Sequence, residues 1–188
     1  MIFIIEHLEP ELGEWSLIEY KHISKIVGPK HLWFTNVPEK DVKKLKKLGK
    51  VLSAPLRQIG LKRMIILDPE APSLLTPDDA LNHEYIILGG ILGDYPPRKR
   101  TQQELTCYFP EAETRNIGKV QMSTDNAVYT AQQILHGIPF SKLKFQDNIT
   151  IQLNKIESVD FPFRYNVVNG KPLFSPELIK YLKKKETL

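Results

Sequence analysis

Cysteine is almost absent from this sequence, in which Cys107 is the single example among 188 residues. One cysteine cannot close an intramolecular disulfide, so a disulfide-stabilised secreted fold is excluded. Long hydrophobic runs are also missing, because the longest apolar run near the N-terminus, Ile2 to Ile5, is far too short for a signal peptide or a membrane span. These deficits predict a cytoplasmic protein that does not act in a membrane.

Metal-ligand clusters and nucleotide-binding fingerprints are missing as well. The five histidines are scattered, with no His-x-x-x-His pair and no cysteine at zinc spacing. Neither the Gly-x-Gly-x-x-Gly pattern of dinucleotide-binding folds nor the Gly-x-x-x-x-Gly-Lys pattern of a P-loop occurs. The sequence therefore predicts no metal site and neither of these two nucleotide-binding motifs.

Charge is present in a modest positive excess, with a net charge of +4 at pH 7. Much of the excess lies in two lysine clusters, Lys43 to Lys50 and Lys180 to Lys185, each on a segment with the pattern of an amphipathic helix. The clusters fit the solvated faces of such helices. They also leave open an anionic partner such as RNA or a ribosomal particle.

Short apolar runs alternate with helical patterns along the first half of the chain. The runs are consecutive rather than alternating, which is typical of strands covered on both faces in a parallel sheet; they are Ile2 to Ile5, His31 to Phe34, Arg63 to Leu67 and Tyr85 to Leu88. Helices are predicted around Trp15 to Ile26, Val42 to Leu48, Ala127 to Leu135 and about 175–185. We expect an α/β fold that forms a single domain over residues 1–188.

A glycine-rich segment, Leu88-Gly-Gly-Ile-Leu-Gly-Asp94, follows the fourth run, where α/β folds place their ligand crevices. It is either a ligand loop or a tight turn packed on a helix. The next residues, Asp94-Tyr-Pro-Pro-Arg-Lys-Arg-Thr101, hold an acid and several cations near two prolines. Arg98 and Arg100 are candidates to clamp a phosphate or carboxylate, and the alternative is a solvated basic loop.

A polar segment, Gly118 to Asp125, precedes the helix of Ala127. Amide groups at a helix N-terminus can hold the polar edge of a ligand, although Ser123, Thr124 and Asp125 also suit plain helix caps. Glu6 ends the first strand, and in a parallel sheet it faces the same edge as the glycine segment if that strand is central.

These motifs together resemble one family. The set comprises Ile4 to Glu9 with Glu14-Trp15, Leu67-Asp-Pro69, Leu88 to Asp94 with Pro96-Pro-Arg98 and Arg100-Thr101, Arg115-Asn-Ile-Gly118, Gln121-Met122, Thr124-Asp-Asn-Ala127 and Pro162-Phe-Arg-Tyr165. In this order they are similar to the archaeal and eukaryotic SPOUT methyltransferase family once labelled predicted RNA methyltransferases. The resemblance spans Met1 to about Tyr165.

The resemblance implies a parallel sheet flanked by helices with a deep trefoil knot over about 84–165, and S-adenosyl-L-methionine bound among the knot loops. One wall of that site is implied to be Leu88, Gly89, Gly90 and Gly93, and the other Ile117, Gly118, Gln121, Met122 and Thr124. It also implies methylation of an arginine in a protein substrate, ribosomal or otherwise associated with translation, and favours a monomer over a dimer.

Transfer to arginine needs a carboxylate that orients the guanidinium and accepts its proton, and the candidates are Glu6, Asp94 and Asp125. If the acceptor is RNA, Arg98, Arg100 and the lysine clusters should instead hold phosphates. A third alternative is a non-catalytic module of the same fold that binds RNA or ribosomes.

Overall fold

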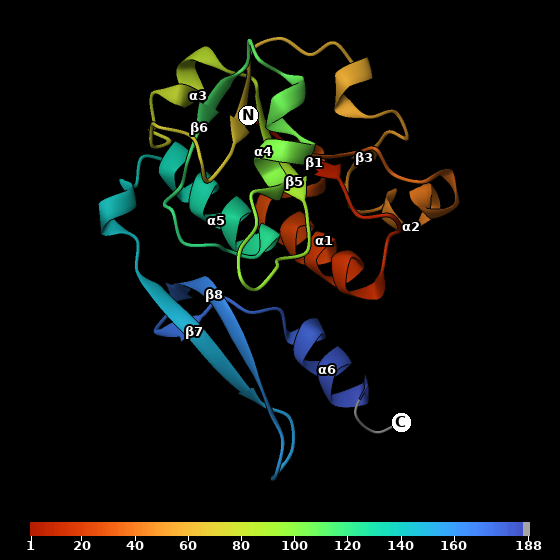
Figure 1. Cartoon of the computed structure of the whole chain (residues 1–188), viewed down its shortest axis with the longest axis vertical. Coiled ribbons are helices and arrows are strands. Elements are labelled where there is room, and N and C mark those ends of the chain that lie inside the picture. The colour runs from red at the N-terminus through yellow and green to blue at the C-terminus, as the bar shows by residue number, and fades with distance from the viewer. Residues whose placement is uncertain (186–188) are drawn as a thin grey trace.

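A parallel sheet of six strands forms the centre of the computed structural model, which describes residues 1–185 (Figure 1). The strands lie in the order β3-β2-β1-β5-β4-β6, and every neighbouring pair is parallel. Their bounds are β1 Ile2–His7, β2 Leu32–Thr35, β3 Lys50–Val51, β4 Met64–Leu67, β5 Tyr85–Gly90 and β6 Glu113–Arg115. The predicted parallel sheet with flanking helices is confirmed, and residues 186–188, the end of the predicted domain, lie outside the described residues.

Helices connect the strands and cover the sheet. The α-helices are α1 Glu14–Val27, α2 Val42–Leu45, α3 Asp79–Asn82, α4 Arg100–Glu104, α5 Thr124–Leu135 and α6 Pro176–Lys185. Single turns of 3-10 helix are η1 Pro29–His31, η2 Glu39–Asp41, η3 Leu56–Gln58, η4 Thr106–Tyr108 and η5 Phe140–Lys142. Figure 1 shows α1 and α5 side by side on one face of the sheet.

Both faces of the sheet are buried, as the consecutive apolar positions predict. In β1, Phe3 and Ile5 belong to the core beneath α1 and α5, whereas Ile4 between them belongs to the core on the opposite face. That second face is closed by Leu56 of η3 and by Leu105, directly after α4. A strand with no polar face has to be covered twice, which explains why β1 and β5 lie in the interior of the sheet.

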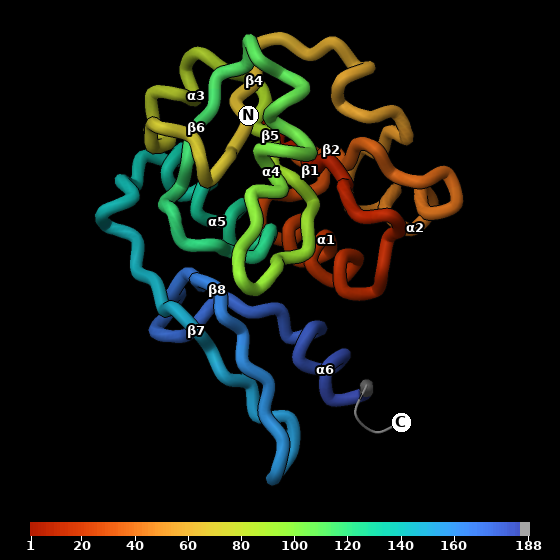
Figure 2. The backbone as a smooth tube through the Cα atoms, in the orientation of Figure 1, coloured from red at the N-terminus to blue at the C-terminus, as the bar shows by residue number. Residues whose placement is uncertain are grey.

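A second, antiparallel sheet projects from the body beside α6 (Figures 1 and 2). Its strands are β7 Phe145–Gln152, β8 Ser158–Val168 and β9 Lys171–Pro172. Phe161 and Tyr165 of β8 join Ile18 of α1 and Leu178 of α6 in a separate hydrophobic core. Helix α1 is therefore packed on two sides, against the first sheet and against this hairpin. No strand is predicted in this region from the sequence.

The first lysine cluster is not an amphipathic helix. Helix α2 ends at Leu45, after a single turn, and the chain enters β3 at Lys50. The reason is the close approach of Gly49 to β2, because a Cβ on Gly49 would lie 2.4 Å from the carbonyl oxygen of Leu32. A helix continued through Leu48 could not bring that backbone so near the strand. The prediction of a helix over Val42 to Leu48 is wrong in its second half.

Gly90 is the last residue of β5 and faces the interior. A Cβ there would lie 2.2 Å from the hydroxyl oxygen of Tyr20 and 2.9 Å from Ile5, both buried. We expect Gly90→Ala to lower the free energy of unfolding by about 1–3 kcal/mol, because strand and helix must separate. Urea unfolding measures the change. Gly13→Ala is the matched control, since its added Cβ meets nothing within 4 Å, and equal stability of the two variants would contradict this packing.

Candidate functional site

A cavity, here called cavity A, opens at the carboxyl ends of β4 and β5, where α5 begins. Leu88 to Asp94 forms one side, and Ile117 to Thr124 forms the other. Its lining residues are Leu67, Asp68, Pro69, Leu88, Gly89, Ile91, Leu92, Gly93, Asp94, Arg98, Arg100, Thr101, Ile117, Gly118, Val120, Gln121, Met122, Thr124 and Ala127. The glycine segment and the segment before α5, which the sequence places far apart, therefore meet across one cavity.

Most residues predicted to bind the cofactor line cavity A. They are Leu88, Gly89, Gly93, Ile117, Gly118, Gln121, Met122 and Thr124. Gly90 is not among the lining residues, because its α-carbon packs against Tyr20 and Ile5 in the core. Gly90 thus serves close packing of β5 on α1 and is withdrawn from the predicted cofactor wall. Gly93 does need its missing side chain there, since a Cβ would lie 2.4 Å from Nε2 of Gln121.

The two arginines beside cavity A are held by carboxylates of the same chain. Arg98 donates from Nε and Nη2 to Asp94, at 3.0 and 2.7 Å. Arg100 donates to Glu104 and, from Nη1, to Glu9 at 2.8 Å. The predicted phosphate clamp is not formed by free guanidinium groups. Arg100 instead ties the glycine segment down, because Glu9 also accepts a hydrogen bond from the amide of Leu92.

The three predicted catalytic acids lie in three different environments. Glu6 is buried at the β1–β2 junction, where its carboxyl group accepts hydrogen bonds from the Thr35 hydroxyl and the Leu56 amide, and it does not line cavity A. Asp94 lines cavity A, and the hydrogen bond from Arg98 lowers its pKa. A carboxylate with a lowered pKa is a weak proton acceptor. Asp125 lies elsewhere, in a second cavity.

This second cavity, cavity B, lies between α1, α5, β8 and α6. It shares Ile91, Leu92, Gly93 and Met122 with cavity A. Its other lining residues are Trp15, Glu19, Ser123, Asp125, Val159, Asp160, Phe161, Pro162, Phe163, Tyr165, Phe174, Ser175 and Leu178. The acids Glu19, Asp125 and Asp160 carry its charge, and among the described residues no lysine or arginine lines it. Cavity B therefore suits a cation.

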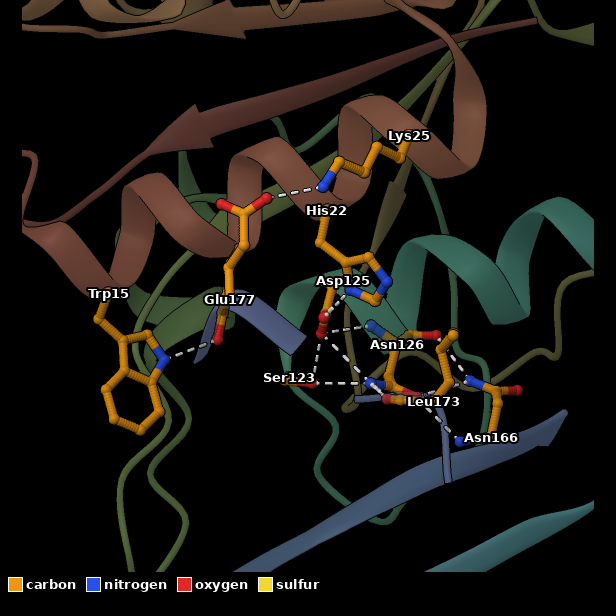
Figure 3. Close-up of polar contacts among 10 residues, drawn as sticks. Trp15, His22, Lys25, Ser123, Asp125, Asn126, Asn166, Leu173 and Glu177 are labelled. Atoms are coloured by element: carbon orange, nitrogen blue, oxygen red, sulfur yellow. Dashed lines mark hydrogen bonds and ion pairs between the residues drawn. The ribbon is translucent and has the colours of Figure 1, made fainter. Parts of the chain in front are cut away.

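Asp125 is fixed by hydrogen bonds in the wall of cavity B (Figure 3). Its Oδ2 lies 2.6 Å from Nδ1 of His22, on α1. Its Oδ1 accepts from the Ser123 hydroxyl at 2.6 Å and from the amide of Asn126 at 2.8 Å. The predicted cap is thus part of a longer network that joins α5 to α1.

Glu19 faces the same cavity from α1 and is only 6% exposed. Burial, and next the negative charge of Asp125, raise its pKa from the ordinary 4.5 to about 8, against smaller opposing effects of hydrogen bonds from Trp15 and Thr124. The Trp15 indole N–H donates to Oε1 at 2.9 Å. Cavity B therefore holds an acid whose protonation changes near neutral pH, next to a second carboxylate.

Aromatic side chains form the opposite wall of cavity B. Phe161, Phe163 and Tyr165 alternate along β8, so their side chains point to one face of the strand. Phe161 lies 6.0 Å from Trp15 between ring centroids. The motifs around Trp15 and Tyr165 carry the family resemblance, but sequence reasoning gave no role to Trp15, Glu19 or this aromatic wall. The alternation of aromatic residues from Phe161 was the available signal.

Buried amides attach β8 to α5 beneath cavity B (Figure 3). The side-chain oxygen of Asn126 accepts the backbone N–H of Asn166 at 2.9 Å, and its amide nitrogen donates to the carbonyl of Leu173 at 3.0 Å. Asn166 in turn donates to the carbonyl of Asn126 at 3.0 Å. Nearby, the amide of Arg164 donates to the carbonyl of Gln121 at 2.8 Å. The hairpin is thus held by its backbone to the segment that lines both cavities.

Within residues 1–185, no three histidine, cysteine or acidic side chains come together as a metal-binding group. No helix in that part of the chain has the length and apolar character that crossing a membrane requires.

Comparison with known proteins identifies relatives along nearly the whole chain. The family model described as Protein arginine N-methyltransferase SFM1-like matches residues 2–187. Protein arginine N-methyltransferase SFM1 of Saccharomyces cerevisiae is 37% identical over 202 aligned positions, which cover 98% of this chain and 95% of the yeast protein. The family resemblance seen in the sequence motifs is confirmed.

Solved structures share the fold. The crystal structure of yeast arginine methyltransferase SFM1 complexed with SAM aligns with a TM-score of 0.89 at 36% identity, covering 100% of this chain and 92% of that one. Dual specific Trm10 from Thermococcus kodakaraensis aligns with a TM-score of 0.57 at 16% identity, over 75% of this chain and 95% of that one, which shows likeness of fold only.

The raised pKa of Glu19 predicts a pH-dependent cost to folding. Below about pH 4.5 the carboxyl group is protonated in both states; as pH rises toward 8 it ionises in the unfolded chain first, so stability is lost. Glutamine cannot ionise, so Glu19→Gln should gain stability relative to the unsubstituted protein between pH 5 and 8, by on the order of a few kcal/mol.

Urea unfolding at a series of pH values measures this gain. Exposed Glu111→Gln is the control and should show no such trend. A stability difference for Glu19→Gln that stays constant across this pH range would show that Glu19 is not buried beside a second charge.

Proposed function

The chain belongs to the SFM1-like family of protein arginine N-methyltransferases, and on that premise we propose that it transfers a methyl group from S-adenosyl-L-methionine to an arginine of a protein. Cavity A is the proposed site of the methyl donor. The observation that carries this proposal is that both segments expected to bind the cofactor meet in that one cavity.

The residues of cavity A fit this cofactor. Leu88, Ile117 and Met122 offer apolar surfaces to a flat adenine ring. Asp94 and Arg98 place opposite charges beside the cavity, which suits a ligand that carries both an ammonium and a carboxylate group. Gly93 keeps the backbone close to Gln121 and Phe163, where a larger residue does not fit.

Catalysis in cavity A rests on positioning. When bound, S-adenosyl-L-methionine supplies a methyl group on a sulfonium sulfur. The chain has to hold the acceptor in line with that methyl group and keep water away. Cavities A and B share the wall of Ile91 to Gly93 and Met122, so ligands in the two cavities can meet there.

Several finer features belong to this proposal. The chain forms one domain, with a trefoil knot over about 84–165, and the bond between the Gln121 carbonyl and the Arg164 amide supports a threaded arrangement. It acts as a monomer, because one chain supplies every wall of both cavities. The acceptor is a ribosomal or other translation-associated protein. The lone exposed Cys107 supports a cytoplasmic location.

Transfer of radiolabel from S-adenosyl-L-methionine tests the proposed reaction. The acceptor is an extract of cells whose own copy of this gene is deleted, so that its substrate is unmethylated. We expect label that is removed by protease, resists ribonuclease and yields methylarginine on hydrolysis. Label removed by ribonuclease would instead establish an RNA acceptor, and no incorporation would support a non-catalytic module.

A change in the wall of cavity A should weaken cofactor binding. Ala127 lines the cavity on the first turn of α5, so the larger side chain of Ala127→Leu takes up ligand space. We expect the dissociation constant for S-adenosyl-L-methionine to rise by about tenfold or more, equivalent to about 1.4 kcal/mol. Calorimetry measures it, with exposed Ala54→Leu as the matched control. Equal affinity in both variants would place the cofactor elsewhere.

A further inference from the structure

We propose that cavity B binds the side chain of the acceptor arginine and that Glu19 accepts the proton which the arginine loses. This inference rests on the proposed methyl transfer and assigns the second half of the site. Cavity B has the three properties that such an acceptor needs: negative charge, flat aromatic surface and an opening to the donor.

The charge of cavity B selects a cation. Glu19 and Asp125 face the cavity from two different helices, α1 and α5. A guanidinium group carries a positive charge and five N–H donors, which match carboxylate oxygens. Phosphate groups would meet only negative side chains there. Cavity B therefore favours a protein acceptor over RNA.

The aromatic wall orients the same group. Guanidinium planes stack on aromatic faces with a gain of roughly 0.5–2 kcal/mol, and cavity B offers Trp15, Phe161, Phe163 and Tyr165. The space between these rings and the two acids suits a planar cation on an unbranched alkyl stem. Trp15 also holds Glu19 through its indole N–H, so one residue serves both purposes.

The two acids have different capacities for the reaction. Asp125 already accepts hydrogen bonds on both oxygens, from Ser123 and Asn126 on one and from His22 on the other, so it acts as a fixed negative charge. Glu19 accepts hydrogen bonds from Trp15 and Thr124. A carboxylate offers about four acceptor positions, so Glu19 keeps room for a guanidinium N–H.

The reaction then balances within the two cavities. One guanidinium nitrogen forms the N–CH₃ bond as the S–CH₃ bond of the donor breaks, and the electron pair of the broken bond stays on sulfur. That nitrogen releases an N–H proton to the carboxylate of Glu19. A pKa near 8 makes Glu19 a stronger proton acceptor than an ordinary carboxylate. The product is a methylated guanidinium, and Glu19 returns the proton to water.

The pH profile of transfer should report this group. Around Glu19, the titratable groups are Asp125 and, behind it, His22; Tyr165 of β8 and Tyr20 of α1 are neutral, because burial raises the pKa of both. Glu19 has to be ionised to accept a proton. The value of kcat/KM should therefore rise with pH and level off above about pH 8.

Glu19→Gln tests the assignment directly, with Glu19→Asp as the conservative variant and exposed Glu111→Gln as the control. The probes are S-adenosyl-L-methionine, whose binding is measured by calorimetry, and the gene-deleted extract as methyl acceptor. We expect Glu19→Gln to bind the cofactor normally, to lose at least about a hundredfold in kcat/KM and to lose the rise toward pH 8. Glu19→Asp should recover part of the rate.

The outcomes separate the two proposals. If the unsubstituted protein neither binds the cofactor nor labels protein, the proposed function fails. If it labels protein arginine and Glu19→Gln does so at the same rate with the same pH profile, the role of Glu19 is overturned while the function stands. If Glu19→Gln loses cofactor affinity in parallel with rate, Glu19 belongs to the donor site and the assignment of cavity B is wrong.

Discussion

The contact between Asn126 and Asn166 is the constraint on which the rest of the site depends. Both side chains are almost completely inaccessible to solvent, and Asn126 is 0% exposed. A buried amide that loses its partner keeps the full cost of its desolvation, so this pair holds β8 in one position on α5. Everything that β8 contributes to cavity B, including its aromatic wall, is placed by that contact.

A second consequence of the same docking is the burial of two acids. When the hairpin and α6 close over α1, Glu19 and Asp125 are left between helices with little water. Such a pair opposes folding, and a carboxylate that is retained in this setting is typical of a functional site rather than of a stabilised core. Stability and reactivity are therefore in tension at Glu19, and the hydrophobic core around Ile18 and Phe161 offsets the cost.

Sequence patterns predicted the first sheet well because its strands are apolar on consecutive positions. Phe3, Ile4 and Ile5 can be buried only between two layers, so the architecture follows from hydrophobicity alone. The hairpin was missed because its outward positions, such as Thr150 and Asp160, are polar and pair with each other, which dilutes the apolar signal. Helix α2 was overextended because periodicity does not register the tight approach of Gly49 to β2.

The sequence carries local signals for the donor side of the candidate site only. Glycines and a helix start mark a ligand crevice, which is why Gly89, Gly93 and Thr124 could be predicted to lie together. Glu19 gave no local signal, because its environment is built by α5 and β8, far away in the sequence. Long-range packing also decides the place of Glu6, which ends a central strand but whose carboxyl group points toward Thr35 and Leu56.

Cavities A and B together form one continuous site for donor and acceptor in the mechanism proposed above. A crystal structure of the protein with S-adenosylhomocysteine and L-arginine amide tests this most directly. We predict the nucleoside in cavity A, the thioether sulfur beside Gly93 and Met122, and the guanidinium group within hydrogen-bonding distance of Glu19. A guanidinium group bound outside cavity B, with the nucleoside in cavity A, would contradict the mechanism.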